Sequence, residues 1–367
     1  MKVICLQENL KTNLNIVQNI IGRNLTLPIL NNLLLETEGG RLKISSTNLE
    51  IGINTWTTGK VETTGAITCP AKILASFVSS LPNKKVELEA KNNVLTVRCE
   101  GYKATIKCLS AEDYPIIPKL KEDPLAIGEI RTFRDGLSQV AGLAAISESR
   151  PEITGIFFGF EKYDLRLAAT DSFRLGEKIV ARIQKKNSDI ASFILPQRTA
   201  QELIRVFGER EGELKIVMGS SQIMFEGGDV QVVSRLIEGQ YPPYQQIIPK
   251  SLGTQIALSK DELVNNIRVA GLFSSRINDV LFSVQSKGLE ILSQDSDLGA
   301  NKSQMEADVK GKTGFEVKFN FRYLLDGLAN IGAKQVMFGL NADSGPAVIR
   351  PIGDESYLYV VMPIKNS

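Results

Sequence analysis

Three stretches decide the fold: "CPAKILASFVSSLP" (residues 69–82), "LPQRTAQELIRVFG" (195–208) and "FNFRYLLDGLANIG" (319–332). They align without gaps, and their second residues, Pro70, Pro196 and Asn320, lie about a third of the 367-residue chain apart. Self-similarity at a fixed period is the signature of a repeated structural unit. The sequence therefore predicts three similar domains, which we place at residues 1–122, 123–250 and 251–367.

Each stretch predicts a helix with one apolar side. In the first stretch the apolar residues follow the i, i+3, i+4, i+7 spacing of a helix that packs on a core, namely Leu74, Phe77, Val78 and Leu81. The second stretch keeps this spacing, and in the third Gly327 interrupts it. Alternating apolar and polar runs, typical of strands, follow each helix.

A second helix is predicted at the start of each repeat, and Ser259 with Glu262 forms a capping box before the third of these. The strands that follow carry Asn48, Asp171 and Asp295 at one repeat position. The predicted fold class is therefore α+β, with two helices per domain packed on antiparallel sheets.

Composition excludes several kinds of site. The chain has no histidine, which removes the commonest general base and zinc ligand, and we find no phosphate-binding glycine loop or nucleophile motif. The four cysteines have no CxxC spacing and are expected to be reduced and buried. No cofactor is predicted. Since no apolar run could span a bilayer and no signal peptide opens the chain, a cytoplasmic protein without membrane contact is expected.

The repeat also aligns one basic residue on each of the three helices, off the apolar side. The net charge is only +2, so the chain does not hold nucleic acid by overall basicity, although its positive charge can gather on one face. The alternatives for these residues are a face toward DNA or an ordinary solvated surface. They are Lys72, Arg198 and Arg322.

Three function classes stay open at this point. The first is a protein that binds DNA without catalysis. The second is an enzyme that uses carboxylates such as Asp171 and Asp295 as acid and base, and the third is a scaffold that binds peptides but not DNA. The absence of histidine and phosphate loops counts against the enzyme.

The segments "GRNLTLPILNNLLLE", "SRPEITGIFF", "AATDSFRLG", "LIEGQYPPYQQIIPK" and "YVVMPIK", in this order, resemble the β sliding clamps of bacterial DNA polymerase III. The resemblance runs from Met1 to about Lys365. It implies a head-to-tail homodimeric ring that encircles duplex DNA, with helices lining the hole and sheets outside. A clamp loader opens the ring, which then tethers the replicative polymerase and makes synthesis processive without catalytic activity of its own.

In such a ring the three repeated basic residues would surround the DNA and contact phosphates without reading bases. The resemblance adds two further candidates for DNA contact, Arg23 in "IGRNLTLPIL" and Arg150 in "SESRPEIT". Surface charge without function is the alternative for each of them.

The resemblance also implies a groove where the replicative polymerase, clamp loader and repair proteins insert short linear motifs with apolar anchors. Carried over residue by residue, the groove comprises Ile153, Thr170, Ser172, Phe173, Arg174, Leu175, Pro242, Ile247, Val360, Met362, Pro363 and Ile364. Burial of an apolar anchor is worth about 1.5 to 3 kcal/mol.

The groove departs from the family pattern in two places. Many clamps have Gly-His where this chain has Ser172-Phe173, so the wall is expected to be more apolar and insensitive to pH. The common Met-Arg near the end becomes Ile364-Lys365. Strand alternation predicts that Val361 faces the core while Val360 faces partners together with Met362 and Ile364.

Ring closure is expected to pair an edge strand of the first domain with one of the third, which would cover two exposed sheet edges. The residues that match the family's contact regions are Ile106, Leu272 and Phe273. Packing in the core of the domain is the alternative for each of them.

Overall fold

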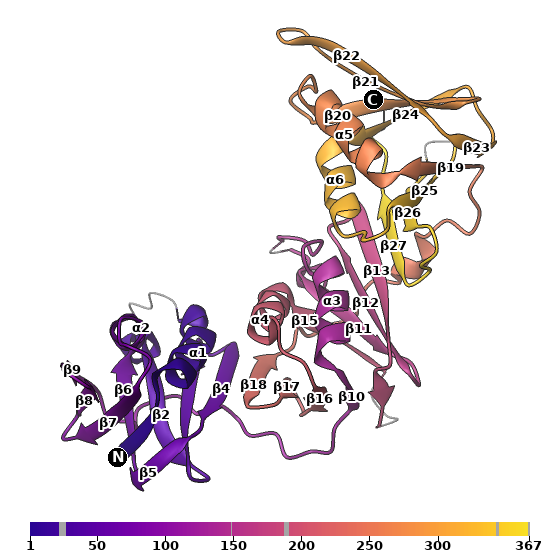
Figure 1. The fold of residues 1–367 in the computed structure, drawn as a ribbon. Coiled ribbons are helices and arrows are strands. Elements are labelled where there is room, and N and C mark those ends of the chain that lie inside the picture. The colour runs from indigo at the N-terminus through magenta and orange to yellow at the C-terminus, as the bar shows by residue number, and fades with distance from the viewer. Residues whose placement is uncertain (22–26, 148, 187–190, 343–344, 366–367) are drawn as a thin grey trace. The chain divides into compact units, whose positions relative to one another are not determined.

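The computed structural model describes the chain except residues 22–26, 148, 187–190, 343–344 and 366–367. One order of elements occurs three times: a strand, a helix, five strands, a helix and three strands (Figure 1). This threefold order confirms the repeat that the sequence predicts.

The first repeat comprises β1 (Lys2–Leu6), α1 (Gln7–Val17), β2 (Asn32–Glu38), β3 (Arg41–Thr47), β4 (Ile51–Thr57), β5 (Gly59–Thr63), β6 (Ala66–Pro70), α2 (Ala71–Ser79), β7 (Lys85–Lys91), β8 (Val94–Cys99) and β9 (Tyr102–Lys107). The second comprises β10 (Ala126–Glu129), α3 (Ile130–Ala141), β11 (Gly155–Phe160), β12 (Asp164–Thr170), β13 (Arg174–Ala181), β14 (Gln184–Lys185), β15 (Ser192–Pro196), α4 (Gln197–Phe207), β16 (Glu213–Met218), β17 (Gln222–Gly227) and β18 (Val230–Arg235). The third comprises β19 (Thr254–Ser259), α5 (Lys260–Gly271), β20 (Asp279–Gln285), β21 (Gly288–Asp295), β22 (Gly299–Glu306), β23 (Asp308–Gly311), β24 (Phe315–Asn320), α6 (Phe321–Ala329), β25 (Gln335–Leu340), β26 (Ala347–Pro351) and β27 (Tyr357–Val361).

The helices begin and pack as their sequences predict. Leu74 and Val78 of α2 are fully buried, in line with the apolar spacing. The Ser259 hydroxyl accepts a hydrogen bond from the Glu262 N–H and so caps α5, while the Asn320 side chain caps α6. Helix α1 packs against α2, and α5 packs against α6 (Figure 1).

Asn48, Asp171 and Asp295 occupy equivalent turns, each just before the next strand. In each turn the side-chain oxygen accepts hydrogen bonds from the backbone N–H groups two and three residues further on, at 2.8 to 3.1 Å. This is the turn geometry that Asn and Asp favour. The repeat therefore keeps these residues for a structural reason, and the carboxylates of Asp171 and Asp295 are engaged in their own turns.

The strands form four antiparallel sheets. Two sheets have nine strands each, in the orders β14-β10-β16-β17-β18-β4-β3-β2-β6 and β15-β11-β12-β13-β27-β26-β25-β19-β23. The first repeat also contributes a five-stranded sheet, β5-β1-β7-β8-β9, and the third a four-stranded sheet, β22-β21-β20-β24. The fold class is thus α+β with antiparallel sheets, as predicted.

Each nine-stranded sheet joins two consecutive repeats at one place. The last strand of the second repeat, β18, pairs with β4 of the first, and the last strand of the third, β27, pairs with β13 of the second. The register is the same at both junctions: Val230, the first residue of β18, lies opposite Thr55, the fifth of β4, and Tyr357, the first of β27, lies opposite Lys178, the fifth of β13. The two junctions therefore pair equivalent strands in the same register.

Two connecting segments cover the nine-stranded sheets. The segment after β9 places Ile117 and Leu120 against Val217, Met224 and Val233 of the first sheet. The segment after β18 places Tyr241 and Tyr244 in a cluster with residues of the second sheet, among them Ala168, Leu175, Val348, Leu358 and Val360. These connecting segments are thus packed parts of the fold.

By compactness the chain divides into two units, one of residues Met1–Arg131, Gln184–Ile190 and Glu202–Leu236, and one of the rest. Each unit contains one nine-stranded sheet, so the division cuts through the second repeat. The three domain ranges that we infer from the repeat stay a prediction.

Candidate functional site

The turn between β12 and β13 presents an aromatic wall. Ser172 has φ = 78°, a left-handed conformation that is uncommon for residues other than glycine. The turn is held by the Thr170 hydroxyl, which donates to the Arg174 carbonyl at 2.7 Å and accepts from the Ser172 N–H at 3.1 Å. Phe173, the next residue of the turn, is 58% exposed.

The Phe173 ring stacks on Tyr323 of α6, with ring centroids 6.2 Å apart and planes at 25°. The Arg174 guanidinium lies 4.6 Å from the centre of the same Tyr323 ring and forms ion pairs with Asp171 and Asp326. Burial tends to lower the pKa of Arg174, but the hydrogen bond to Asp326 and the nearby anionic groups outweigh it and raise the pKa. The wall therefore combines an exposed apolar ring with a permanently charged guanidinium.

The same nine-stranded sheet carries a cavity of about 470 Å³, lined by Phe157 and residues 240–245, which include the predicted groove residue Pro242. The Tyr241 and Tyr244 rings stand 5.4 and 5.7 Å from the Phe157 ring. The Tyr244 hydroxyl donates to Glu177 at 2.6 Å, and both burial and this carboxylate raise the pKa of Tyr244. The aromatic floor is thus fixed by packing and one buried hydrogen bond.

The segment after β27 is held against the Phe173 turn and β24 by two backbone hydrogen bonds. The Met362 N–H donates to the Phe173 carbonyl at 2.8 Å, and the Ile364 N–H donates to the Lys318 carbonyl at 2.8 Å. Met362 and Ile364 are half-buried, whereas Pro363 between them is buried. Ile247 adds a side chain that is 48% exposed.

The alternation predicted for the last strand is wrong at Val360. Val360 is 1% exposed and Val361 is fully buried. The reason is that β27 lies inside a nine-stranded sheet covered on both faces: Tyr359 reaches α6 through a hydrogen bond from its hydroxyl to the Tyr323 carbonyl, while Val360 packs with Tyr241 and Leu175. Val360 and Leu175 therefore belong to the packed layer beneath the surface.

Arg150, predicted to contact DNA, lies next to the turn that carries Ser172 and Phe173. Its guanidinium donates to the Ser172 hydroxyl at 3.1 Å and to Glu152 at 3.2 Å. The neighbouring Ile153 is buried, and its carbonyl accepts a hydrogen bond from the Ala145 N–H. Arg23 lies outside the described residues.

The three repeated basic residues lie at equivalent places, the second residue of α2, α4 and α6. All three side chains are exposed, and none forms an ion pair with a described residue. They are Lys72, Arg198 and Arg322.

The residues predicted at the dimer interface differ in exposure. Ile106 lies on β9 and is only 6% exposed, which favours the alternative of core packing for its side chain. Leu272, at the end of α5, is 69% exposed, and Phe273 beside it is half-buried. Leu272 is thus the residue of this set that offers an exposed apolar contact.

All four cysteines are free and buried. Over the described part of the chain, no three or more histidine, cysteine, aspartate or glutamate side chains are grouped so that they could bind a metal ion. No helix among the described residues is both long and apolar enough to cross a membrane.

Models of the N-terminal, central and C-terminal domains of the DNA polymerase III beta subunit match residues 1–118, 129–243 and 245–365. The chain belongs to this family. A beta sliding clamp of Synechocystis sp. is 30% identical, and the match covers 100% of this chain and 99% of the relative. The crystal structure of a Bacillus subtilis DNA polymerase sliding clamp has a TM-score of 0.94 at 23% identity, with full coverage of both chains.

The family therefore consists of sliding clamps of DNA replication, which are processivity subunits and not enzymes, and this chain is one of them. A clamp from Pseudomonas aeruginosa bound to griselimycin is 25% identical, with a TM-score of 0.93 and full coverage of both chains. The open choice between a DNA-binding protein, an enzyme and a scaffold is thereby decided for the clamp.

Sequence reasoning missed Tyr323 and Asp326, which complete the wall around Phe173 and Arg174. Both lie on α6, about 150 residues away along the chain, and no periodicity connects them with the turn. It also missed a cavity of about 680 Å³ on the four-stranded sheet of the clamp, which no predicted site residue lines.

Proposed function

We propose that this clamp acts as a head-to-tail homodimeric ring in the cytoplasm, which encircles duplex DNA without reading its sequence. In this proposal it tethers the replicative polymerase, and it receives the clamp loader and repair proteins through the surface around Phe173. The observation that carries the ring is the repeated junction between consecutive repeats.

The pairing seen at the two internal junctions leaves two edge strands without a second partner strand among the described residues, namely β9 and β22. In the two nine-stranded sheets, a five-stranded part of one repeat joins a four-stranded part of the preceding repeat. The remaining five-stranded sheet ends at β9, the last strand of the first repeat, and the remaining four-stranded sheet ends at β22, the counterpart of β4 and β13. Two chains placed head to tail would join β9 of each to β22 of the other and cover both free edges.

The common register makes this proposal specific. If the first residue of β9 lies opposite the fifth residue of β22, Tyr102 pairs with Ser303 and Ala104 with Asn301. The Cys108 N–H bonds to the Asn93 carbonyl, so even-numbered residues of β9 direct their backbone groups toward β8. Ala104 and Asn301 would then form a non-hydrogen-bonded pair, whose side chains come closest in an antiparallel sheet.

Cysteines introduced together by Ala104→Cys and Asn301→Cys test this register. Mild oxidation should join two chains covalently, and the product should have twice the mass of the chain on a non-reducing gel. The control is Ala104→Cys with Ser303→Cys, which shifts the register by two residues and should cross-link far less. Equal cross-linking in both variants, or none in either, would contradict the proposed closure.

DNA binding is proposed to use the exposed basic residues at the starts of the second helices. An exposed lysine or arginine side chain facing phosphate adds non-specific attraction without reading bases. Such contacts suit a protein that slides along the duplex. In a dimer these positions occur six times. They are Lys72, Arg198 and Arg322; Arg150 and Arg23 stay predictions of the same kind.

The proposed partner surface consists of the Phe173 wall, the half-buried Met362 and Ile364, and the exposed Ile247. Exposed apolar side chains beside a cavity suit the apolar anchors of a short linear motif, and an adaptable methionine lets one surface accept several partners. That a related clamp binds griselimycin supports a ligand-binding surface in this family.

A further inference from the structure

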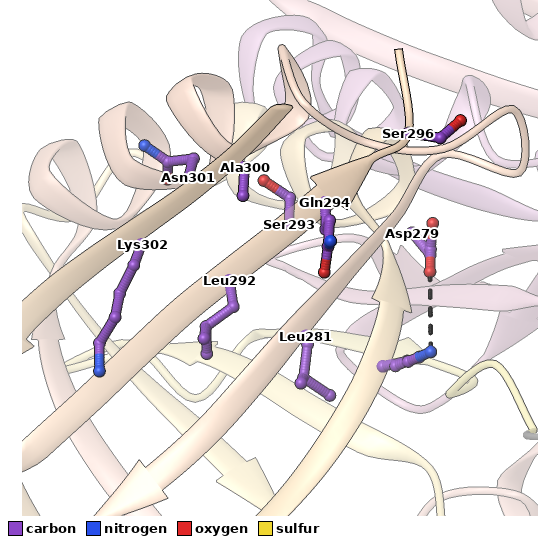
Figure 2. A pocket seen from close by; sticks show the side chains of 10 residues that line it. Asp279, Leu281, Leu292, Ser293, Gln294, Ser296, Ala300, Asn301 and Lys302 are labelled. Atoms are coloured by element: carbon purple, nitrogen blue, oxygen red, sulfur yellow. Dashed lines mark ion pairs between the residues drawn. The ribbon is translucent and has the colours of Figure 1, made fainter. Parts of the chain in front are cut away.

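The four-stranded sheet of the third repeat carries a cavity of about 680 Å³ on the face away from its buried core (Figure 2). Leu281 and Leu292 point into the same side of the sheet as Lys302, and Asp279 is ion-paired with Lys318 at the rim (Figure 2). No aromatic side chain lines this cavity. It is therefore a hollow with an apolar floor and a charged rim.

The floor residues have counterparts in both nine-stranded sheets, because corresponding strands begin at equivalent positions. Asp279 is the first residue of β20, as Asn32 is of β2. Leu292 is the fifth of β21, as Ser45 is of β3 and Ala168 of β12. The remaining counterparts are Leu281 with Phe157, each third in its strand, and Ala300 with Gly52 and Leu175, each second.

In the first nine-stranded sheet a tyrosine from the segment after β9 packs against the counterparts of these floor residues. The Tyr114 hydroxyl lies 3.2 Å from the Asn32 carbonyl oxygen and 3.5 Å from that of Ser45, and its side chain is buried. Further along the same segment, Ile117 lies so close to Gly52 that a Cβ there would stand 2.7 Å from it. A Tyr-Pro segment of the chain thus fills the hollow.

The second nine-stranded sheet repeats this arrangement. The buried Tyr241, which precedes Pro242, packs in one cluster with Ala168 and Leu175, and its ring lies 5.4 Å from Phe157. The two sheets that join repeats therefore use the same positions to hold a Tyr-Pro segment. Over the described residues, the four-stranded sheet holds no such segment.

We propose that the cavity of the third repeat is a second docking site, for a partner peptide that carries a Tyr-Pro anchor. The tyrosine would lie on Leu281 and Leu292, as Tyr241 lies on Phe157 and Ala168 and as the Tyr114 hydroxyl lies against Ser45. The proposal goes beyond the ring and the Phe173 surface, and it does not depend on ring closure because every lining residue lies in one repeat.

The charge of the rim favours an acidic residue beside the tyrosine. Lys302 is the fourth residue of β22, and its counterpart in the second nine-stranded sheet is Glu177. The Glu177 carboxylate accepts a hydrogen bond from the Tyr244 hydroxyl. A cation at this position would attract a carboxylate instead. The chain's own segment after β9 combines acidic residues with a Tyr-Pro pair in this way, at Glu112-Asp113-Tyr114-Pro115.

The probe is a synthetic, fluorescently labelled peptide with the sequence of residues 110–119, SAEDYPIIPK, added to the full-length protein. Fluorescence polarisation should show saturable binding. Replacement of the peptide tyrosine by alanine should weaken it at least ten-fold, and Leu292→Ser in the protein should do the same. The matched control is Leu298→Ser, because Leu298 is an exposed leucine of the same hairpin that does not line the cavity and its loss should leave binding unchanged.

Three results would overturn the proposal. The first is no saturable binding at millimolar protein. The second is equal binding of the alanine peptide. The third is binding that Phe173→Ala abolishes and Leu292→Ser does not, since the peptide would then occupy the proposed partner surface.

Discussion

Replacement of the exposed Phe173 by alanine separates its contribution to partner binding from its contribution to the fold. Phe173 stacks on Tyr323 with 58% of its surface exposed. An aromatic pair of this kind is worth about 0.5 to 1.5 kcal/mol, so Phe173→Ala should lower the free energy of unfolding by about that amount.

The effect on partner binding has a separate origin and is measured separately. Full burial of a phenylalanine side chain stabilises by about 1.5 to 3 kcal/mol, and a bound anchor would cover little more than half of Phe173. The expected loss is therefore about 1 to 1.5 kcal/mol, which raises Kd roughly five- to twelve-fold.

The assay is isothermal titration of the full-length clamp with a peptide that carries the linear motif of the replicative polymerase, alongside denaturant unfolding of each variant. Tyr163→Ala is the matched control, because Tyr163 is 57% exposed and has one cation–π contact, with Lys162 at 5.1 Å. An unchanged Kd for Phe173→Ala, or an equal loss in the control, would remove Phe173 from the partner surface.

Three further predictions concern DNA, packing and pH. Alanine at all three repeated basic positions should lower retention on circular DNA and flatten its dependence on salt without loss of the dimer seen by sedimentation; unchanged salt dependence would return these side chains to the solvated surface. Gly327→Ala should cost about 1 to 3 kcal/mol in thermal unfolding, because the new Cβ would lie 2.4 Å from the buried Tyr359 ring, whereas Gly332→Ala meets open space and should cost less. Partner-peptide affinity should stay constant between about pH 6 and 9, because the chain has no histidine and the raised pKa of Arg174 keeps its charge until far higher pH; a clear titration in that range would contradict this reading. The residues replaced in the first of these are Lys72, Arg198 and Arg322.

Most of the fold could be predicted from local patterns in the sequence. The spacing of Leu74 and Val78 predicts the buried side of α2, and the capping residue Ser259 predicts the start of α5, because both depend on neighbours within one or two turns. The equivalence of Asn48, Asp171 and Asp295 followed from the repeat, and each indeed forms the same turn.

Contacts between distant strands could not be derived in this way. Strand alternation predicts an exposed Val360, but the segment after β18 places Tyr241 over that face of β27 and buries Val360. For the same reason nothing near Phe173 in sequence indicates that Tyr323 lies beside it. The cavity near Leu292 could not be predicted from the sequence either, since it depends on which connecting segment covers which sheet.

The identical register at the two internal junctions has a consequence for how a ring would come apart. β18 and β4 belong to one chain, so they meet at an effective concentration set by the connecting segment, whatever the amount of protein present. A β9–β22 contact between chains would have no such tether, and its closure would be bimolecular. In the proposed ring, dilution should therefore separate the two chains while both nine-stranded sheets stay intact. Of the six junctions in such a ring, the two between chains would be the ones that a clamp loader could open without unfolding a domain.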